Sequence, residues 1–296
     1  MIFIDGVGIG NEDYSSNPFF KYGFKTFKKF FGSIPSLENP TLCTGNRFLF
    51  PVDACLGVEG LPQSGTGQTS IFCGVNAPAL IGKHFGPYPY STLIPILQKK
   101  NIFKHFIDKG KKVSFANAYP KVFFDYIRSG KKRMSATTLM CQLNGMRLNK
   151  ANDVRKGRAL TAEITNERWN RKLGYNLPIV LPEMAAKRLL HIASKNDFTL
   201  YEYFLTDHIG HGRYADEFEL IMDSLDKFLF KIFEDLDYQN STLIVCSDHG
   251  NLENTSIKSH TFNPALMIAA GKNSQKIFEL VDDLTKIKKA VTKFIK

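Results

Sequence analysis

The sequence predicts an α/β domain with a mostly parallel central sheet and helices on both faces. Short, nearly continuous apolar runs occur at residues 1–4, 113–116, 199–205, 241–246 and 265–269, and such runs are typical of strands that are buried on both faces. Helical patterns lie between several of them. Strands that alternate with helices indicate an open sheet with right-handed crossover connections.

Three segments show helical periodicity. Residues 91–109 form one, which ends before Gly110, and residues 275–295 close the chain as another. The clearest is 216–236, where one apolar stripe contains Phe218, Ile221, Leu225, Phe228, Leu229, Ile232 and Leu236. This stripe predicts a helix that packs on the sheet.

The segment from about residue 124 to residue 190 fits the alternation less well. It is rich in Lys, Arg, Asn and Gly, and it contains the only tryptophan, Trp169. We interpret residues 1–296 as a single catalytic domain in which 124–190 is a small inserted cap. Two ordinary helical excursions of the core are the alternative interpretation.

Composition narrows the class of protein. With 43% hydrophobic and 23% charged residues in 296, the chain has the profile of a soluble globular protein. No apolar run approaches the roughly 20 residues that span a bilayer, and the first residues lack the basic region of a signal peptide, so we expect no membrane partner. The five cysteines include no C-x-x-C pair. Reduced thiols and a cytoplasmic location are therefore expected.

The net charge of +11 favours anionic partners. Residues 19–31 mix Lys with Phe and Tyr, a composition that could stack on single-stranded nucleic acid. An amphipathic helix with inward-facing aromatic residues explains the same pattern, so nucleic acid is not the expected partner. A small phosphorylated substrate is expected instead, and the sequence does not indicate an oligomeric state.

Acidic residues follow three of the predicted strands. Asp5 ends the first, Asp207 ends the strand at 199–205, and Asp248 with His249 ends the strand at 241–246. Ligands of open α/β sheets bind beyond the carboxyl ends of the strands. Three carboxylates that converge there would repel one another, and bound cations would relieve that cost.

Histidines accompany these carboxylates. His211 comes four residues after Asp207, so one helical turn would present both to one ion, and His260 follows the polar loop at residues 250–259. Asp and His ligands without Cys suit Zn²⁺ or Mn²⁺. We therefore expect two divalent ions of this kind, with Mg²⁺ as a further option.

A glycine-rich segment at residues 61–70 provides a candidate nucleophile. Ile71 and Phe72 follow this glycine-rich turn, so we expect a helix to begin near Thr69. The N–H groups and the dipole at the amino terminus of such a helix would suit a phosphoryl group. A hydroxyl there would become nucleophilic if a metal lowered its pKa. A capped helix after a turn is the alternative, and the nucleotide-binding pattern G-x-x-x-x-G-K-[ST] is absent. His84 is a candidate substrate contact.

Together these residues resemble the alkaline phosphatase superfamily, and within it the branch of cofactor-independent phosphoglycerate mutase and phosphopentomutase. The matching pieces are 3–10, 67–69, Asp207-x-x-x-His211, 247–251 and 259–264, in the order of the family. The resemblance implies that Thr69 is transiently phosphorylated and that Gln68 contacts phosphate. It further implies one metal held by Asp5, Thr69, Asp248 and His249, and a second held by Asp207, His211 and His260.

The departures from the family favour hydrolysis. The mutase has a large second domain after its nucleophile, and the residues between Thr69 and Asp207 are too few for such a domain. The C-x-P-x-R context of the sulfatases is absent. We therefore expect a metal-dependent phosphatase or phosphodiesterase, with an intramolecular phosphomutase as the alternative. A non-catalytic binding protein is disfavoured because all the expected ligand positions carry competent residues.

Overall fold

A central sheet organises the chain in the computed structural model, which describes residues 1–131 and 133–294. In this part of the chain the sheet has seven strands in the order β2-β3-β7-β6-β1-β5-β4. Their bounds are β1 Ile2–Ile4, β2 Leu42–Thr44, β3 Arg47–Val52, β4 Val113–Phe115, β5 Phe198–Tyr203, β6 Thr242–Cys246 and β7 Ala265–Gly271. All five predicted strands are present, and β2 and β3 are additional.

The predicted α/β fold is confirmed, and its sheet is mixed, with parallel pairing in one half and antiparallel pairing in the other. β6, β1, β5 and β4 are parallel neighbours, whereas β2, β3, β7 and β6 pair in antiparallel fashion. The physical reason lies in the connections. A two-residue turn joins β2 to β3, and residues 247–264 return from β6 to β7 without a helix. A parallel pair needs a crossover connection, usually an α-helix, and neither of these connections contains one.

Pro51 explains why β3 is hard to find in the sequence. Proline cannot donate a ladder hydrogen bond, so a proline within an apolar run argues against a strand. In the structure, the pairing of β3 with β2 ends at Leu49 opposite Leu42. Pro51 lies beyond that point and pairs only with Leu266 of β7. Its missing N–H therefore costs no hydrogen bond to β2.

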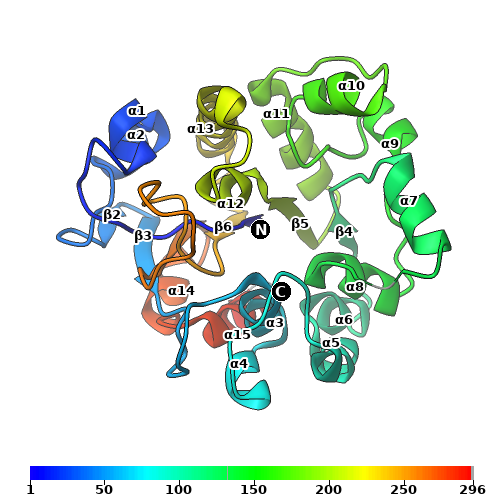
Figure 1. The fold of residues 1–296 in the computed structure, drawn as a ribbon, viewed down its shortest axis with the longest axis horizontal. Coiled ribbons are helices and arrows are strands. Elements are labelled where there is room, and N and C mark those ends of the chain that lie inside the picture. Colours follow the sequence, from blue (N-terminus) through cyan, green and yellow to red (C-terminus); the bar gives the residue numbers. More distant parts are fainter. Residues whose placement is uncertain (132, 295–296) are drawn as a thin grey trace.

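Helices cover both faces of the sheet, as predicted, and the three layers are visible in Figure 1. On one side lie α1 (Pro18–Tyr22), α2 (Lys25–Phe31), α11 (Pro182–Ala193) and α13 (Phe218–Asp235). On the other side lie α3 (Ser64–Cys73), α5 (Ile94–Lys100), α6 (Ile102–Ile107), α8 (Ala136–Leu143), α14 (Ser274–Leu280) and α15 (Leu284–Phe294). Each layer has its own large cluster of buried apolar side chains.

The predicted helices are present with shorter bounds. The segment 91–109 divides at Asn101, whose side chain accepts a hydrogen bond from the Lys104 N–H at 2.8 Å and so caps α6. The segment 275–295 forms α14 and α15, and its last residue lies outside the described part of the chain. The apolar stripe of 216–236 packs into the core through α13. Among the described residues, no helix has the length and apolar character that crossing a bilayer requires.

The segment predicted as a cap supplies side chains to three separate apolar clusters. Its helices α8 and α11 pack in the two core layers. Between them lie α9 (Ala151–Arg155) and α10 (Glu167–Leu173), whose surroundings hold a separate small apolar cluster around Trp169. The helix α7 (Lys121–Arg128) precedes α8. The part of the chain with a core of its own is therefore centred on α9 and α10 and is smaller than 124–190. That this part acts as a cap over the active site remains a prediction.

Candidate metal centre and active site

The three acidic strand ends meet at one edge of the sheet. β6, β1 and β5 are consecutive and parallel, so their carboxyl ends lie side by side. Asp5 continues β1, and its N–H donates to the Tyr203 carbonyl at 2.9 Å. Asp248 follows β6 directly after Ser247, and Asp207 lies in α12 (Leu205–Gly210), the short helix that follows β5. The sequence pattern thus predicted the correct edge.

A first group of candidate ligands consists of Asp5, Asp248 and His249. All three are buried, and one ligand atom of each lies within 4.8 Å of the others. The Nε2 atom of His249 lies 3.4 Å from an Asp5 oxygen and 3.6 Å from an Asp248 oxygen. Gly6, which follows Asp5, has φ +67°, and a Cβ there would lie 2.9 Å from an Asp207 oxygen, so only glycine fits the turn.

A second group consists of Asp207, His211 and His260, again within 4.8 Å of one another. The Nε2 atoms of the two histidines lie 3.2 Å apart, at 3.3 Å and 3.5 Å from the same Asp207 oxygen. The spacing of four residues between Asp207 and His211 places both on one turn, as predicted. The two groups adjoin, because the rings of His249 and His260 stack with centroids 3.7 Å apart.

Backbone carbonyls orient all three imidazoles. The Nδ1 atoms of His211, His260 and His249 lie 2.8 Å from the Lys258 oxygen, 2.6 Å from the Pro62 oxygen and 3.4 Å from the Gly250 oxygen, respectively. Their Nε2 atoms are thereby directed at the carboxylates. Metal-binding histidines use their second nitrogen in this way, which holds the ring in position. The groups are therefore arranged as two ligand sets.

The electrostatics of the carboxylates also fit cation binding. Burial, followed by the charges of Asp248 and Asp207, raises the pKa of Asp5 well above its usual range. Burial would likewise raise the pKa of Asp207, but hydrogen bonds from His211 and His260 outweigh burial and lower it. The hydrogen bond with Asp207 raises the pKa of His211. Oxygen and nitrogen ligands without sulfur match Zn²⁺ or Mn²⁺.

The structure does not bring Thr69 to these groups, which corrects the predicted position of the nucleophile. Thr69 is fully buried inside α3, and its Oγ1 donates to the Gly65 carbonyl at 2.7 Å. The first residue of α3 is instead Ser64, so the expected helix start near Thr69 is wrong by one and a half turns. The Ser64 Oγ lies 3.0 Å from the His249 Nε2 and 3.5 Å from an Asp5 oxygen.

Close packing explains why a glycine-rich segment is helical here. A Cβ at Gly65 would lie 2.2 Å from the Tyr88 oxygen, and a Cβ at Gly67 would lie 2.9 Å from the Asp248 Cβ. These glycines therefore let α3 approach the chain at residues 85–88 and the end of β6. The sequence signal for Ser64 is a second hydroxyl in the same glycine-rich segment as Thr69.

Of the two predicted substrate contacts, Gln68 lies at the first group of candidate ligands and His84 does not. Gln68 lies at the first group, where its amide donates to Asp5 at 3.4 Å and to Asp248 at 3.5 Å, while its buried Oε1 has no partner among the described residues. A bound hydrogen-bond donor or a bound cation would satisfy that oxygen. His84 lies outside both groups, with its Nε2 3.3 Å from the Val58 oxygen, and burial lowers its pKa.

Glu253 and Asn251 are site residues that the sequence did not indicate. The Asn251 amide donates to an Asp207 oxygen at 2.7 Å. Glu253 is 1% exposed and joins three loops. One of its oxygens accepts the N–H groups of Gly8 and Asn251, each at 2.8 Å, and the other accepts from Thr261 and from Asn263. Glu253 thus connects the loops that carry Asp5, His249 and His260.

We expect Glu253→Gln to lower both thermal stability and metal affinity. All four partners of Glu253 donate, whereas glutamine would present an NH₂ group to two of them. Each buried donor left without an acceptor costs about 1–3 kcal/mol. Thermal unfolding and metal titration would measure the two effects. The exposed Glu219→Gln serves as the matched control, and a Glu253→Gln protein equal to it in both respects would refute the connecting role.

Glu202 gives a prediction for the pH dependence of stability. Burial, opposed by a hydrogen bond from Thr137 and assisted by the charge of Asp248, raises the pKa of Glu202 from 4.5 to about 7. The folded state therefore favours the protonated carboxyl, and this contribution to stability is complete below pH 4.5 and disappears as the pH rises through 7. At about 1.36 kcal/mol per pKa unit, the loss is about 3 kcal/mol.

The Glu202→Gln variant isolates this contribution. We expect its free energy of unfolding to fall less than that of the wild type between pH 5 and pH 8, in paired denaturant titrations at each pH. Parallel curves for the two proteins over that range would show that Glu202 does not titrate there.

Sequence comparison assigns the carboxyl-terminal part of the chain. Residues 180–296 match the model of the Metalloenzyme superfamily. The 2,3-bisphosphoglycerate-independent phosphoglycerate mutase of Metamycoplasma hominis is 32% identical over an alignment of 104 residues. That alignment covers 31% of this chain and 21% of the mutase. The enzyme of that name from Gracilaria tenuistipitata var. liui is 35% identical over 101 residues, 30% of this chain and 20% of the mutase. The chain thus spans about a fifth of the length of these relatives.

Structural comparison covers the whole chain. The alkaline phosphatase of the Antarctic bacterium TAB5 superimposes with a TM-score of 0.51 at 12% identity, over 99% of this chain and 96% of that enzyme. A cold-active alkaline phosphatase from a psychrophilic Shewanella species gives a TM-score of 0.51 at 10% identity, over 100% and 99% of the two chains. At such low sequence identity, the two superpositions show only that the fold is shared. Residues 180–296 thus match the model of the Metalloenzyme superfamily, and the chain as a whole shares its fold with alkaline phosphatases.

Proposed function

We propose that the protein is a metal-dependent phosphoester hydrolase that uses Ser64 as its nucleophile. One observation carries this proposal: the Ser64 hydroxyl lies at the amino-terminal end of α3, 3.0 Å from the His249 Nε2, where two ligand groups adjoin. A helix amino terminus favours an anion through its free N–H groups and its dipole. The hydroxyl and a bound phosphoryl group would therefore both lie at the amino-terminal end of α3.

Two divalent ions, Zn²⁺ or Mn²⁺ with Mg²⁺ as a further option, complete the proposed site. Asp5, Asp248, His249 and Ser64 would hold one ion, and Asp207, His211 and His260 would hold the other. When bound, the ions supply positive charge that lowers the pKa of the Ser64 hydroxyl and offsets the negative charge of the phosphoryl oxygens. Thr69 has no place in this set, because its hydroxyl is engaged inside α3.

The chemistry then proceeds in two displacements. The Ser64 Oγ loses its proton to solvent and forms a bond to phosphorus while the bond from phosphorus to the alcohol oxygen breaks, and the alcohol leaves with a proton from water. A water molecule next attacks the phosphoserine, which releases phosphate and restores Ser64 with its proton. Asn251 and Glu253 hold the surrounding loops in position throughout.

A phosphate-release assay tests this function. Protein stripped of metal and reloaded with Mn²⁺, Zn²⁺ or Mg²⁺ would be incubated with 4-nitrophenyl phosphate and with bis(4-nitrophenyl) phosphate. Metal-dependent release of 4-nitrophenol and an equal amount of inorganic phosphate from the monoester is the expected result. Absence of product with every metal, in protein shown to bind two ions, would contradict hydrolysis.

An intramolecular phosphomutase is the second candidate. The similarity to phosphoglycerate mutases over about a hundred residues favours it, because a phosphorylated Ser64 would be able to return its phosphoryl group to the same substrate. A mutase returns the phosphoryl group to the substrate and must exclude water while it does so. Isomerisation of 3-phosphoglycerate without release of inorganic phosphate would support the mutase, and phosphate release would support the hydrolase.

A further inference from the structure

A cavity of about 410 Å³ lies where the segment around α10 meets the carboxyl ends of β4 and β5. This volume falls within the range of small-molecule sites, about 300–1,000 Å³. Its walls carry five aromatic side chains, which are Tyr119, Phe123, Trp169, Phe204 and Tyr214. Flat rings stack well on such walls. None of these residues belongs to the two candidate metal sites.

The cavity adjoins the proposed phosphoryl site. Glu202 lines the cavity, and in the sheet it pairs with Phe3 of β1. Asp5 lies two residues beyond Phe3 and continues the ladder, so its side chain leaves the sheet on the same face as that of Glu202. From strand spacing and rise, the Cα atoms of Asp5 and Glu202 are about 8 Å apart. One ester can therefore reach from the metal ligands into the cavity.

Positive charge surrounds the cavity at α10. Arg168 and Lys172 line it, and both pair with Glu217 together with Arg171. Three cations thus share the Glu217 carboxylate. Glu163 accepts the N–H groups of Arg168 and Trp169 and so caps the helix, whose first residue, Glu167, is exposed. On the cavity wall, the two cations face only two acids, Glu163 and Glu202, and burial raises the pKa of each to about 7.

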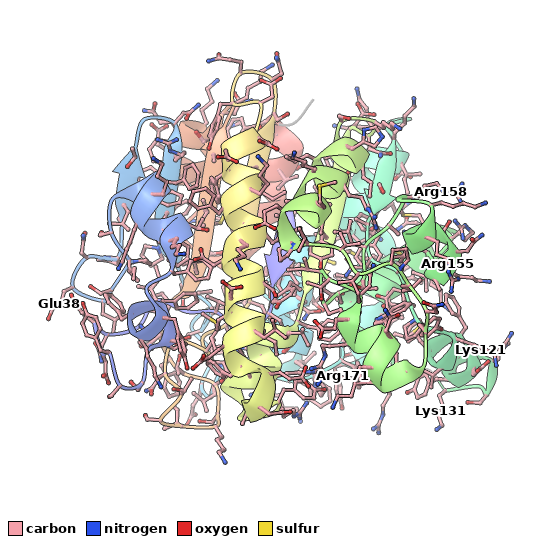
Figure 2. All side chains as sticks on the ribbon, turned by 90° about the horizontal axis from the view of Figure 1, so that it is seen from above. Glu38, Lys121, Lys131, Arg155, Arg158 and Arg171 are labelled. Carbon is pink, nitrogen blue, oxygen red and sulfur yellow. The ribbon has the colours of Figure 1, made fainter. Side chains whose placement is uncertain are left out.

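The distribution of charge over the chain reinforces this local positive charge. Residues 121–195 contain sixteen Lys and Arg against five Asp and Glu, so this quarter of the chain accounts for the whole net charge of +11. Figure 2 shows Lys121, Lys131, Arg155, Arg158 and Arg171 on the α7, α9 and α10 side of the molecule, with Glu38 on the opposite side. Such a field attracts anions toward the cavity.

We propose that this cavity binds the alcohol portion of the substrate, and that this portion is a flat ring that carries a second acidic group. The inference rests on the proposed phosphoryl site and adds its substrate class. The ring would lie among the aromatic walls, and the acidic group would contact Lys172 and the free nitrogens of Arg168. The other Glu202 carboxyl oxygen, which has no hydrogen bond among the described residues, would accept a polar substituent.

The only tryptophan of the chain provides a direct test, because Trp169 is 8% exposed and lines the cavity. Its fluorescence in metal-loaded protein would be titrated with methylphosphonate, phenylphosphonate and 4-carboxyphenylphosphonate, whose C–P bonds resist hydrolysis. We expect phenylphosphonate to bind at least about tenfold more tightly than methylphosphonate, from about 1.4 kcal/mol of ring burial and stacking. The carboxylated compound should bind more tightly again, and only the two ring compounds should change the Trp169 emission.

Two variants divide the contributions. In Lys172→Ala, 4-carboxyphenylphosphonate should lose most of its affinity advantage over phenylphosphonate, while the ratio of the affinities for phenylphosphonate and methylphosphonate should stay unchanged. In Phe123→Leu, that ratio of affinities should fall. Lys156→Ala, an exposed cation that does not line the cavity, is the matched control. Equal affinities for the three compounds, with a silent Trp169, would overturn the cavity proposal and leave the phosphoryl site intact. Failure of all three to compete with inorganic phosphate would instead overturn the phosphoryl site itself.

Discussion

Replacing Ser64 with alanine is expected to abolish phosphoester hydrolysis, with a loss on the order of 10³-fold or more in kcat. The Ser64 Oγ is the hydroxyl at the amino-terminal end of α3 that contacts His249 and Asp5. Without it, no group at the site can carry the phosphoryl group between the alcohol and water. Initial-rate measurements on 4-nitrophenyl phosphate would check the loss, and the metal content of Ser64→Ala would be determined alongside.

Thr69→Val is the matched comparison for this result. The variant removes a hydroxyl that donates only to the Gly65 carbonyl inside α3, so we expect a stability cost of about 1 kcal/mol and nearly unchanged kcat. The two hydroxyls lie in the same helix, five residues apart. A large loss of activity in Thr69→Val with full activity in Ser64→Ala would restore the position that the sequence alone suggested and refute the structural one.

Removal of one ligand group should reduce the bound metal from two ions to one per chain. In the double variant Asp207→Ala, His260→Ala, the second group retains only His211, which cannot hold an ion alone, whereas Asp5, Asp248 and His249 are unchanged. We expect activity to fall by about 10³-fold or more, because one of the two charges that stabilise the displacement is lost. Elemental analysis by mass spectrometry would measure the metal content.

Removal of the metal by a chelator should also lower the free energy of unfolding. Metal at about 100 times its Kd stabilises the fold by about 2.7 kcal/mol per site, so the wild type should lose about 5 kcal/mol on addition of EDTA and the double variant about half of that. The carboxylates of Asp5, Asp207 and Asp248, of which Asp5 and Asp248 are buried and Asp207 is half-buried, would then repel one another. Identical thermal unfolding with and without EDTA would contradict both proposed sites.

Patterns confined to short stretches of sequence predicted much of this molecule. Continuous apolar runs identified β1, β4, β5, β6 and β7, because strands buried on both faces have few polar positions. The 3.6-residue stripe identified α13. The acidic strand ends predicted the edge where Asp5, Asp207 and Asp248 meet, because parallel neighbours place equivalent ends together.

Features that depend on distant contacts were not predictable in this way. The helix α3 begins at Ser64 because Gly65 and Gly67 allow the Tyr88 backbone and Asp248 to approach, and neither neighbour is near in sequence. Glu253 accepts hydrogen bonds from Gly8, which lies 245 residues away in the sequence, and from Asn263, so no short sequence pattern shows its role. Strand β3 contains Pro51, whose tolerance depends on the short length of β2.

The most direct test of the account is to locate the phosphoryl group on the enzyme. Metal-loaded protein would be mixed with a phosphate monoester and quenched in acid, which preserves phosphoserine, and peptide fragmentation by mass spectrometry would identify the modified residue. The account predicts one phosphoryl group on Ser64 in the wild type and in Thr69→Val, and none in Ser64→Ala. Phosphorylation of Thr69, or an active wild type that carries no phosphoryl group on this segment at any quench time, would contradict it.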